Sequence, residues 1–445
     1  MGESMDTCST LASRLAKMNS ICDQEFVYRE MQNIADQVSL AEIAKTGVRD
    51  FTREAAVKRL SDLELVAEIA SHDTSYHVRK TAVKKLSDQV VLAQIAEKDK
   101  DEFVREAAVE NLTDQVALAR VAKKGWPFKV RRAAVKKLMD QALLAEIACN
   151  DKEKPYVRSA AVEKLTDQAL LAYIARGGTF GSWEVRCAAA KMLTDLVVLA
   201  KIARTDEDSS VRRAALGKLT DQAVLAQIAK DDRDPIVRCD AVKKLTDQVV
   251  LAEIAKGDVI PNVRCDAVMK LADQVLVEDI AKTDSDWAVR IAAADHLEDK
   301  KLAQDFYFQI SEGAENERVQ MAAAEKLVDQ TVAQSVFTSL AKNCEDSDVR
   351  KAAVKKLIDP DQEFIAAIAK AGGVHMELRM AALDKLTDQE LLAKVVRDIC
   401  LEGGWASSLP GYALKKLSDP KIVYAIEEER DAVENLRGDH GEFRP

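Results

Sequence analysis

Aspartates recur at a fixed spacing along most of the chain, and a row of carboxylates could bind metal ions or act as general acids and bases. Each follows an Arg, or the residue in its register, by nine residues. The row consists of Asp62, Asp88, Asp114, Asp140, Asp167, Asp195, Asp221, Asp247, Asp273, Asp299, Asp329, Asp359, Asp388 and Asp419. Pro360 and Pro420 directly follow two of them, and proline is favoured at the first position of a helix. We therefore predict that each Asp caps a helix amino terminus, a role worth about 1 kcal/mol, and does no chemistry.

Other residues that often do chemistry stand in no catalytic or metal-binding pattern. Cys187, Cys239 and Cys265 share one register after the Arg, but units stacked about 10 Å apart are too distant for disulfides, which need Cα atoms within roughly 7 Å. The five histidines form no metal-ligand or nucleophile motif. The Gly-Gly pairs at 177–178, 372–373 and 403–404 lack the context of a phosphate loop. We expect no enzymatic activity, no cofactor and no metal.

The elements that must position these residues form a repeat, because the stretch at 77–99 returns at 103–125 and the Arg recurs every 26 residues. The step lengthens to about 30 residues after residue 290. Within one unit, two groups of apolar residues have helical spacing and are separated by a break. They are Val78, Ala82, Val83 and Leu86 before the break and Val91, Leu92, Ile95 and Ala96 after it. We predict about fifteen units of two short helices, which must stack because neither helix buries its stripe alone.

A second row of Asp precedes the Arg by six residues in many units, at Asp73, Asp99, Asp206, Asp232, Asp258 and Asp284. This row resembles the Asp/Arg ladder of HEAT repeats, in which these side chains bridge adjacent units across the inter-repeat turn. The resemblance covers most of residues 26–419, although the unit is shorter than a typical HEAT repeat. The unit also resembles the leucine-rich-repeat variant, whose second helix can be 3₁₀.

The resemblance implies an all-α fold, a right-handed α-solenoid (superhelix) of about 15 short two-helix HEAT-like repeats. We expect a capping helix at 1–25, the repeat array at 26–419, and a charged C-terminal helix and tail at 420–445. In HEAT-like stacks the second helix lines the concave face. Such repeats serve mostly as protein-binding scaffolds, so we expect a non-enzymatic scaffold or adaptor that binds another protein.

A basic row six residues after the Arg raises nucleic acid as an alternative partner. It consists of Arg59, Lys85, Lys137, Lys164, Lys218, Lys244, Lys270, Lys326, Lys356, Lys385 and Lys416. The row is either a solvated face near helix carboxyl termini or a groove that tracks phosphates, as in HEAT-like DNA glycosylases. The formal charge of −10 disfavours nucleic acid and anionic membranes. Chromophore attachment, as in HEAT-like bilin lyases, is a third alternative.

Cysteine usage and the start of the chain favour the cytoplasm. The eight cysteines contain no CxxC pair, and no signal-peptide pattern opens the sequence. We therefore expect a cytoplasmic protein that is not attached to a membrane.

Two departures from the repeat indicate a binding surface. The first is at the outward position of the second helices, which is acidic in the repeats at both ends of the array but holds Arg120, Tyr173 and Lys201 in the middle. The second is that all four tryptophans fall in turns between units, where polar residues are usual. The predicted partner-binding patch comprises Arg120, Trp126, Phe128, Tyr173, Phe180, Trp183 and Lys201, with Trp287, His375 and Trp405 as secondary candidates. The alternatives are surface drift for the outward position, and aromatic rings that fold back as lids over the core.

Overall fold

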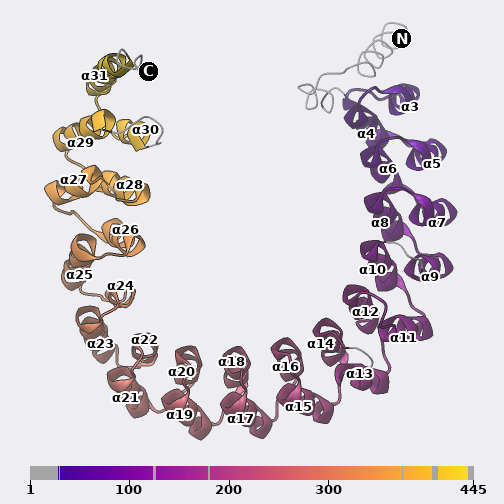
Figure 1. The fold of residues 1–445 in the computed structure, drawn as a ribbon, viewed down its shortest axis with the longest axis horizontal. Helices are drawn as coiled ribbons and strands as arrows, with labels where there is room; N and C mark the ends of the chain where they lie inside the picture. Colours follow the sequence, from indigo (N-terminus) through magenta and orange to yellow (C-terminus); the bar gives the residue numbers. More distant parts are fainter. Residues whose placement is uncertain are drawn as a thin grey trace, which may run out of the picture. The chain divides into compact units, whose positions relative to one another are not determined.

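The computed structural model describes Arg29 and residues 31–123, 127–178, 181–372, 374–402 and 409–438 of the 445 residues. Within them the chain forms 29 helices, α3 to α31, and no strand (Figure 1). Helices α4 to α31 make fourteen consecutive hairpins, and α3 is the second helix of the degenerate unit before them. The predicted all-α solenoid of two-helix repeats is confirmed. The contacts divide the chain into two compact units, Met1–Ile228 and Ala229–Pro445.

The first unit contains first helices that bear the recurrent Arg and second helices that follow the capping Asp. Its first helices are α4 (Asp50–Arg59), α6 (Tyr76–Val83), α8 (Glu102–Asn111), α10 (Phe128–Lys137), α12 (Pro155–Val162), α14 (Trp183–Met192) and α16 (Ser209–Leu216). Its second helices are α3 (Gln37–Thr46), α5 (Leu63–His72), α7 (Gln89–Lys98), α9 (Gln115–Lys123), α11 (Gln141–Cys149), α13 (Gln168–Ala175) and α15 (Leu196–Thr205). The unit ends within α17 (Gln222–Asp231).

The second unit continues the same alternation. Its first helices are α18 (Pro235–Lys244), α20 (Pro261–Val268), α22 (Trp287–His296), α24 (Glu317–Ala324), α26 (Ser347–Lys356), α28 (Met376–Lys385) and α30 (Leu409–Leu414). Its second helices are α19 (Gln248–Gly257), α21 (Gln274–Thr283), α23 (Lys300–Gly313), α25 (Gln330–Asn343), α27 (Gln362–Lys370), α29 (Gln389–Glu402) and α31 (Pro420–Gly438).

The core lies between the two helices of each hairpin and those of its neighbours. In the hairpin of α6 and α7, the side chains of Val78, Val83 and Leu92 are fully buried. Successive first helices of the first unit pack closely, whereas its successive second helices contact one another sparsely. The first helices α4 to α14 therefore form the inner, concave row of this unit (Figure 1). The expectation that the second helix lines the concave face is wrong here, because the Ala-rich first helices approach one another more closely.

Every second helix in the described part of the chain is α-helical, so the 3₁₀ geometry of the leucine-rich-repeat variant does not occur there. Helices α23, α25 and α29 have 14 residues, where α7 and α19 have 10. Four residues add about one turn to an α-helix. Much of the longer step after residue 290 is therefore one extra turn in the second helix, which preserves the hairpin.

The Asp capping prediction is confirmed at all but one position. Backbone N–H groups of the second helices donate to the side chains of Asp62, Asp88, Asp114, Asp140, Asp167, Asp195, Asp221, Asp247, Asp273, Asp299, Asp329, Asp388 and Asp419. Pro420 begins α31, as predicted. The exception is Asp359, which has a φ of 49°.

Asp361, and not Asp359, caps α27, accepting hydrogen bonds from the N–H groups of Glu363 and Phe364 at 3.0 and 3.2 Å. The prediction for Asp359 is wrong because two additional residues precede the second helix in this repeat, so that Pro360 lies before the cap. The Asp-Gln pair that opens most second helices reappears here as Asp361 and Gln362, and it marks the true cap in the sequence.

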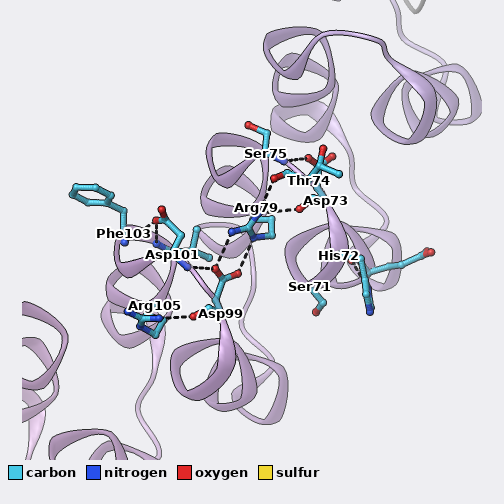
Figure 2. A network of polar contacts seen from close by, with 12 residues as sticks. Ser71, His72, Asp73, Thr74, Ser75, Arg79, Asp99, Asp101, Phe103 and Arg105 are labelled. Carbon is cyan, nitrogen blue, oxygen red and sulfur yellow. Dashed lines mark hydrogen bonds and ion pairs between the residues drawn. The ribbon is translucent and has the colours of Figure 1, made fainter. Parts of the chain in front are cut away.

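Buried Arg/Asp pairs connect successive hairpins, as the resemblance to the HEAT ladder implied. Arg79 donates from Nε and Nη2 to the two carboxylate oxygens of Asp99, at 2.8 and 2.9 Å, and from Nη1 to the carbonyl oxygen of Asp73 at 2.9 Å (Figure 2). Asp99 also accepts a hydrogen bond from the Asp101 N–H at 2.8 Å. One guanidinium thus joins the end of the preceding second helix to the end of its own.

The same bidentate pairing recurs in both units, at Arg53–Asp73, Arg186–Asp206, Arg238–Asp258 and Arg264–Asp284. The hydrogen bond to the Asp raises the pKa of each of these arginines. Burial alone would raise the pKa of Asp258, but hydrogen bonds from Arg238 and the Ile260 N–H outweigh burial and lower it. Arg238 and Asp258 therefore stay charged at neutral pH. The hydrogen bonds within each pair compensate for burying the two charges.

Candidate partner-binding surface

Most of the basic row of the first helices binds backbone carbonyl groups of the preceding repeat, while Lys326, Lys356 and Lys416 form ion pairs with carboxylates there. Lys85 Nζ donates to the carbonyl oxygens of Val57 and Lys58, at 3.1 and 2.9 Å, and to that of Leu60. Equivalent bonds are made by Lys137, Lys164, Lys218, Lys270 and Lys385. Burial lowers the pKa of Lys85. These ammonium groups lie at a helix carboxyl terminus, as one alternative predicted, but the helix belongs to the neighbouring repeat and they are already bound.

The predicted residues of the second helices are exposed and have separate partners. Arg120, on α9, donates from Nε to Glu97 Oε1 on α7 at 2.8 Å. Tyr173, on α13, is 49% exposed, and its ring lies so close to Gly178 that a Cβ there would approach it to 2.5 Å. Lys201, on α15, is exposed beside a shallow cavity of about 590 Å³. These side chains belong to the outer row of helices.

The predicted turn aromatics divide into described and undescribed residues. Trp126, Phe180 and Trp405 lie outside the described residues. Phe128 and Trp183 begin α10 and α14 and are 40% and 46% exposed. Both belong to first helices, which form the inner row, whereas Arg120, Tyr173 and Lys201 lie on second helices.

The secondary candidates Trp287 and His375 differ in their surroundings: the first packs against the core and the second is exposed. Trp287 begins α22 and packs against a buried cluster that includes Ile310, while the Arg290 guanidinium lies 4.2 Å from its ring centroid. This matches the alternative in which a turn aromatic closes over the core. His375 precedes α28 and is exposed.

A row of exposed aromatic rings runs along the amino ends of the inner helices of the first unit. We call Tyr76, Phe103, Phe128 and Tyr156 the aromatic stripe; they are 37%, 41%, 40% and 55% exposed. The ring centroids of Tyr76 and Phe103 are 6.3 Å apart, and those of Phe128 and Tyr156 are 6.1 Å apart. Trp183 occupies the same end of the next inner helix, α14. In Figure 2, the Phe103 ring points away from the Arg79 and Asp99 pair.

Charged side chains of both signs surround the stripe. The Nζ atoms of Lys80 and Lys129 lie 5.4 and 5.5 Å from the Phe103 ring centroid. Lys129 Nζ is also 3.6 Å from Glu102 Oε1. Lys129 directly follows Phe128 in the chain, so a neighbour of one aromatic pair places its ammonium group over a ring of the other.

Sequence reasoning found Phe128 but missed Tyr76, Phe103 and Tyr156. The signal was present, since an aromatic residue stands two or three positions before the recurrent Arg in six successive repeats. These residues are Phe51, Tyr76, Phe103, Phe128, Tyr156 and Trp183. The aromatic residue stands alternately two and three positions before the Arg, so no single position of the aligned repeats is always aromatic. Both positions nevertheless lie in the first turn of the helix.

The cysteines and the acidic side chains are the remaining residues that often do chemistry. In the described ranges, no cluster of three or more His, Cys, Asp or Glu side chains could bind a metal. Burial raises the pKa of Cys239 to about 12 and that of Cys265 to about 11, so both thiols stay protonated at neutral pH. None of the helices in the described part of the chain has both the length and the apolar character needed to cross a membrane.

Stacked helical hairpins joined by buried Arg/Asp pairs give the chain a HEAT-like α-solenoid fold. No family model matches it, and neither does any curated protein. Solved structures with similarity include Kap95p, whose binding induces the switch loops of RanGDP to adopt the GTP-bound conformation, at 13% identity and a TM-score of 0.36 over 86% of this chain and 60% of that one.

Kap121p bound to Pho4p is similar at 13% identity and a TM-score of 0.38, over 94% of this chain and 56% of that chain. The Pds5–Scc1 complex is similar at 12% identity and a TM-score of 0.22, over 98% of this chain and 82% of that one. The chain thus spans less than two thirds of the length of either Kap protein.

Proposed function

We propose that this chain is a non-enzymatic scaffold or adaptor of the cytoplasm whose inner helices bind another protein through the aromatic stripe. The observation that supports this most is the run of half-exposed rings on consecutive repeats, from Tyr76 to Tyr156 and on to Trp183. Contiguous exposed apolar patches mark interaction sites, and Tyr and Trp are frequent hot-spot residues of protein interfaces.

The polar residues that recur from repeat to repeat also favour a protein partner, because most of them already make hydrogen bonds or ion pairs that hold the fold together. The Asp row caps helices, the Arg/Asp pairs join hairpins, and Lys85 with its equivalents binds backbone carbonyls. A phosphate-tracking groove would need those ammonium groups free, so nucleic acid is the less favoured partner. Arg120, Tyr173 and Lys201 stay predicted contacts of the outer surface.

The test compares partner capture by the full chain and by a Phe103→Ala/Tyr156→Ala variant. Ile236→Ala is the matched control, since Ile236 occupies the register of Phe103 and Tyr156 in α18 and is also 55% exposed. We expect the double variant to lose the captured protein while the control and the melting temperature are unchanged. Crosslinks from Tyr156 to the captured protein would locate the contact, and equal capture by all three proteins would refute the proposal.

A further inference from the structure

We infer that Arg176, at the carboxyl end of α13, and Lys201, on α15, bind a carboxylate side chain from an acidic segment of a partner protein. This site goes beyond the proposed function, because it lies on the second helices and takes a charged group, whereas the aromatic stripe lies on the inner helices. Three properties support the assignment: the charge pattern of the second helices, the cavity that the two cations line, and the balance of charge in its lining.

Exposed side chains connect successive second helices by pairing across the gap between repeats. In each pair, one residue stands nine positions after its capping Asp, and the other stands six positions after the Asp of the next second helix. The ion pairs are Lys45–Glu68, Glu97–Arg120, Lys123–Glu146 and Lys230–Glu253, and Arg204 donates to Gln227 Oε1 at 3.0 Å. In these pairs every cation thus meets an acceptor.

At one step of this series both members are cations. Arg176 stands nine residues after Asp167, and Lys201 stands six residues after Asp195. Both side chains are exposed and line the same cavity, and among the described residues neither makes a hydrogen bond or an ion pair. Two cations in these positions repel each other, so the arrangement does not stabilise the fold. A carboxylate between them would restore the pairing that the other steps have.

The cavity has room for a side chain and both polar and apolar walls. Its volume is about 590 Å³, within the range of about 300–1,000 Å³ that is usual for ligand sites. Ala175 and Ile202, which are both buried, supply apolar surface. The cavity can therefore contact the methylene groups of a glutamate while Arg176 and Lys201 bind its carboxylate.

The third cation of the cavity, Arg186, is already held in place. Its Nε and Nη2 donate to the two carboxylate oxygens of Asp206, both at 2.9 Å, and its Nη1 donates to the carbonyl oxygen of Gly181. A Cβ on Gly181 would lie 3.0 Å from Arg186 Cγ, and Gly177 has a φ of 85°, so glycine lets the turn approach this side chain. A wall that is held before binding lowers the entropy cost of binding.

The balance of charge in the lining favours a carboxylate over a phosphate. The cavity is lined by three cations, Arg176, Arg186 and Lys201, and by two anions, Asp206 and Glu207. The surplus is one positive charge, which one carboxylate neutralises. A phosphate group carries about 1.5 to 2 negative charges and would leave an excess of negative charge beside Glu207.

The experiment measures fluorescence anisotropy at low ionic strength, with the full chain titrated into short labelled peptides. The peptides have blocked ends and neutral residues around one central position. This position holds glutamate in the first peptide, glutamine in the second and phosphoserine in the third. We expect the glutamate peptide to bind more tightly than the phosphoserine peptide, and at least about tenfold more tightly than the glutamine peptide, because hydrogen bonds to a charged group are stronger than those to a neutral one.

Two variants remove one cation each, and a third is the matched control. Arg176→Gln and Lys201→Gln should each weaken binding of the glutamate peptide by about tenfold. Arg204→Gln should not, because Arg204, which is exposed and has the register of Arg176 on α15, already donates to Gln227. Lys201→Glu places a carboxylate opposite Arg176, as in the paired steps of the series. It should abolish peptide binding while the chain melts at or above its original temperature.

Any of three results would overturn the inference: no binding of the glutamate peptide, equal binding of the glutamate and glutamine peptides, or an Arg204→Gln variant that binds as weakly as Arg176→Gln. Tighter binding of the phosphoserine peptide would overturn the carboxylate assignment in favour of a phosphorylated segment. A lower melting temperature for Lys201→Glu would show that Arg176 and Lys201 do not oppose each other. The proposed function is tested separately, since Phe103→Ala/Tyr156→Ala leaves both cations in place.

Discussion

Replacing Asp99 with alanine leaves a buried guanidinium without its carboxylate. The side chains of Arg79 and Asp99 are 2% and 5% exposed, so water does not replace the lost partner. Arg79 keeps its bonds to the carbonyl oxygens of Asp73 and Thr74, while the Asp101 N–H loses its acceptor. Removing one partner of a buried ion pair costs about 3–5 kcal/mol, because an uncompensated buried charge stays behind. We expect Asp99→Ala to destabilise the first unit by this amount.

The matched control is Glu146→Ala, which removes a carboxylate from an exposed pair of the same unit. Glu146 and Lys123 are 64% and 52% exposed, and their closest atoms are 2.9 Å apart. Exposed pairs contribute about 0–1 kcal/mol, since water and salt screen them. A third variant, Arg79→Met/Asp99→Leu, replaces both charges with apolar side chains, and such replacements are often neutral or stabilising.

The free energy of unfolding comes from urea titration, and hydrogen exchange of α6 to α8 locates the effect, because repeats of a solenoid mainly stabilise their neighbours. Asp99→Ala should raise exchange in these helices far more than Glu146→Ala does. A cost for Asp99→Ala no larger than that of Glu146→Ala would refute the reasoning, as would a double variant as unstable as Asp99→Ala.

Three further predictions test other contacts. Lys85→Met removes the ammonium group from three backbone carbonyls and should cost about 1–3 kcal/mol, measured by urea unfolding; no change would contradict the link between repeats. The raised pKa values of Cys239 and Cys265 mean that the folded state holds these protons longer, so stability should fall as pH rises from 9.0 toward about 12. Iodoacetamide should accordingly label both thiols more slowly in folded than in urea-unfolded protein, and equal rates would contradict this. Asp361→Ala should lower the melting temperature through loss of about 1 kcal/mol, whereas Asp359→Gly should not, since glycine tolerates its φ of 49°; the reverse order would restore Asp359 as the cap.

The fold could be predicted from the sequence because its signals are local and repeated. The Asp88 side chain accepts hydrogen bonds from the N–H groups two and three residues further along the chain. Val78 and Ala82, four residues apart on one helix, are both buried in the core. Because the same residues recur in each repeat, every repeat is a separate indication of the same capping and core positions. The capping error at Asp359 arose where two extra residues broke the spacing while the local Asp-Gln pair moved with the helix.

The candidate surface could be predicted only in part, because it depends on which helices form the inner row. Phe128 and Trp183 stood out as turn aromatics, but combining them with Arg120 assumed one face, and the structure assigns them to two rows. The partners of Lys85 lie more than twenty residues away, in the preceding repeat. The sequence pattern of a basic row is therefore the same whether its side chains bind a ligand or bind backbone carbonyl groups of the preceding repeat.

The fold does not require an aromatic residue in the first turn of the inner helix. The same register holds Ser210 in α16 and Asn262 in α20, and both helices form and bury their Val and Ala residues as the others do. The core of the hairpin therefore does not need a ring at the position of Phe103 or Tyr156, since Ser and Asn suffice for the same hairpin. A residue that the helix does not need, repeated on consecutive helices of one row, is best explained by contact with something outside the chain.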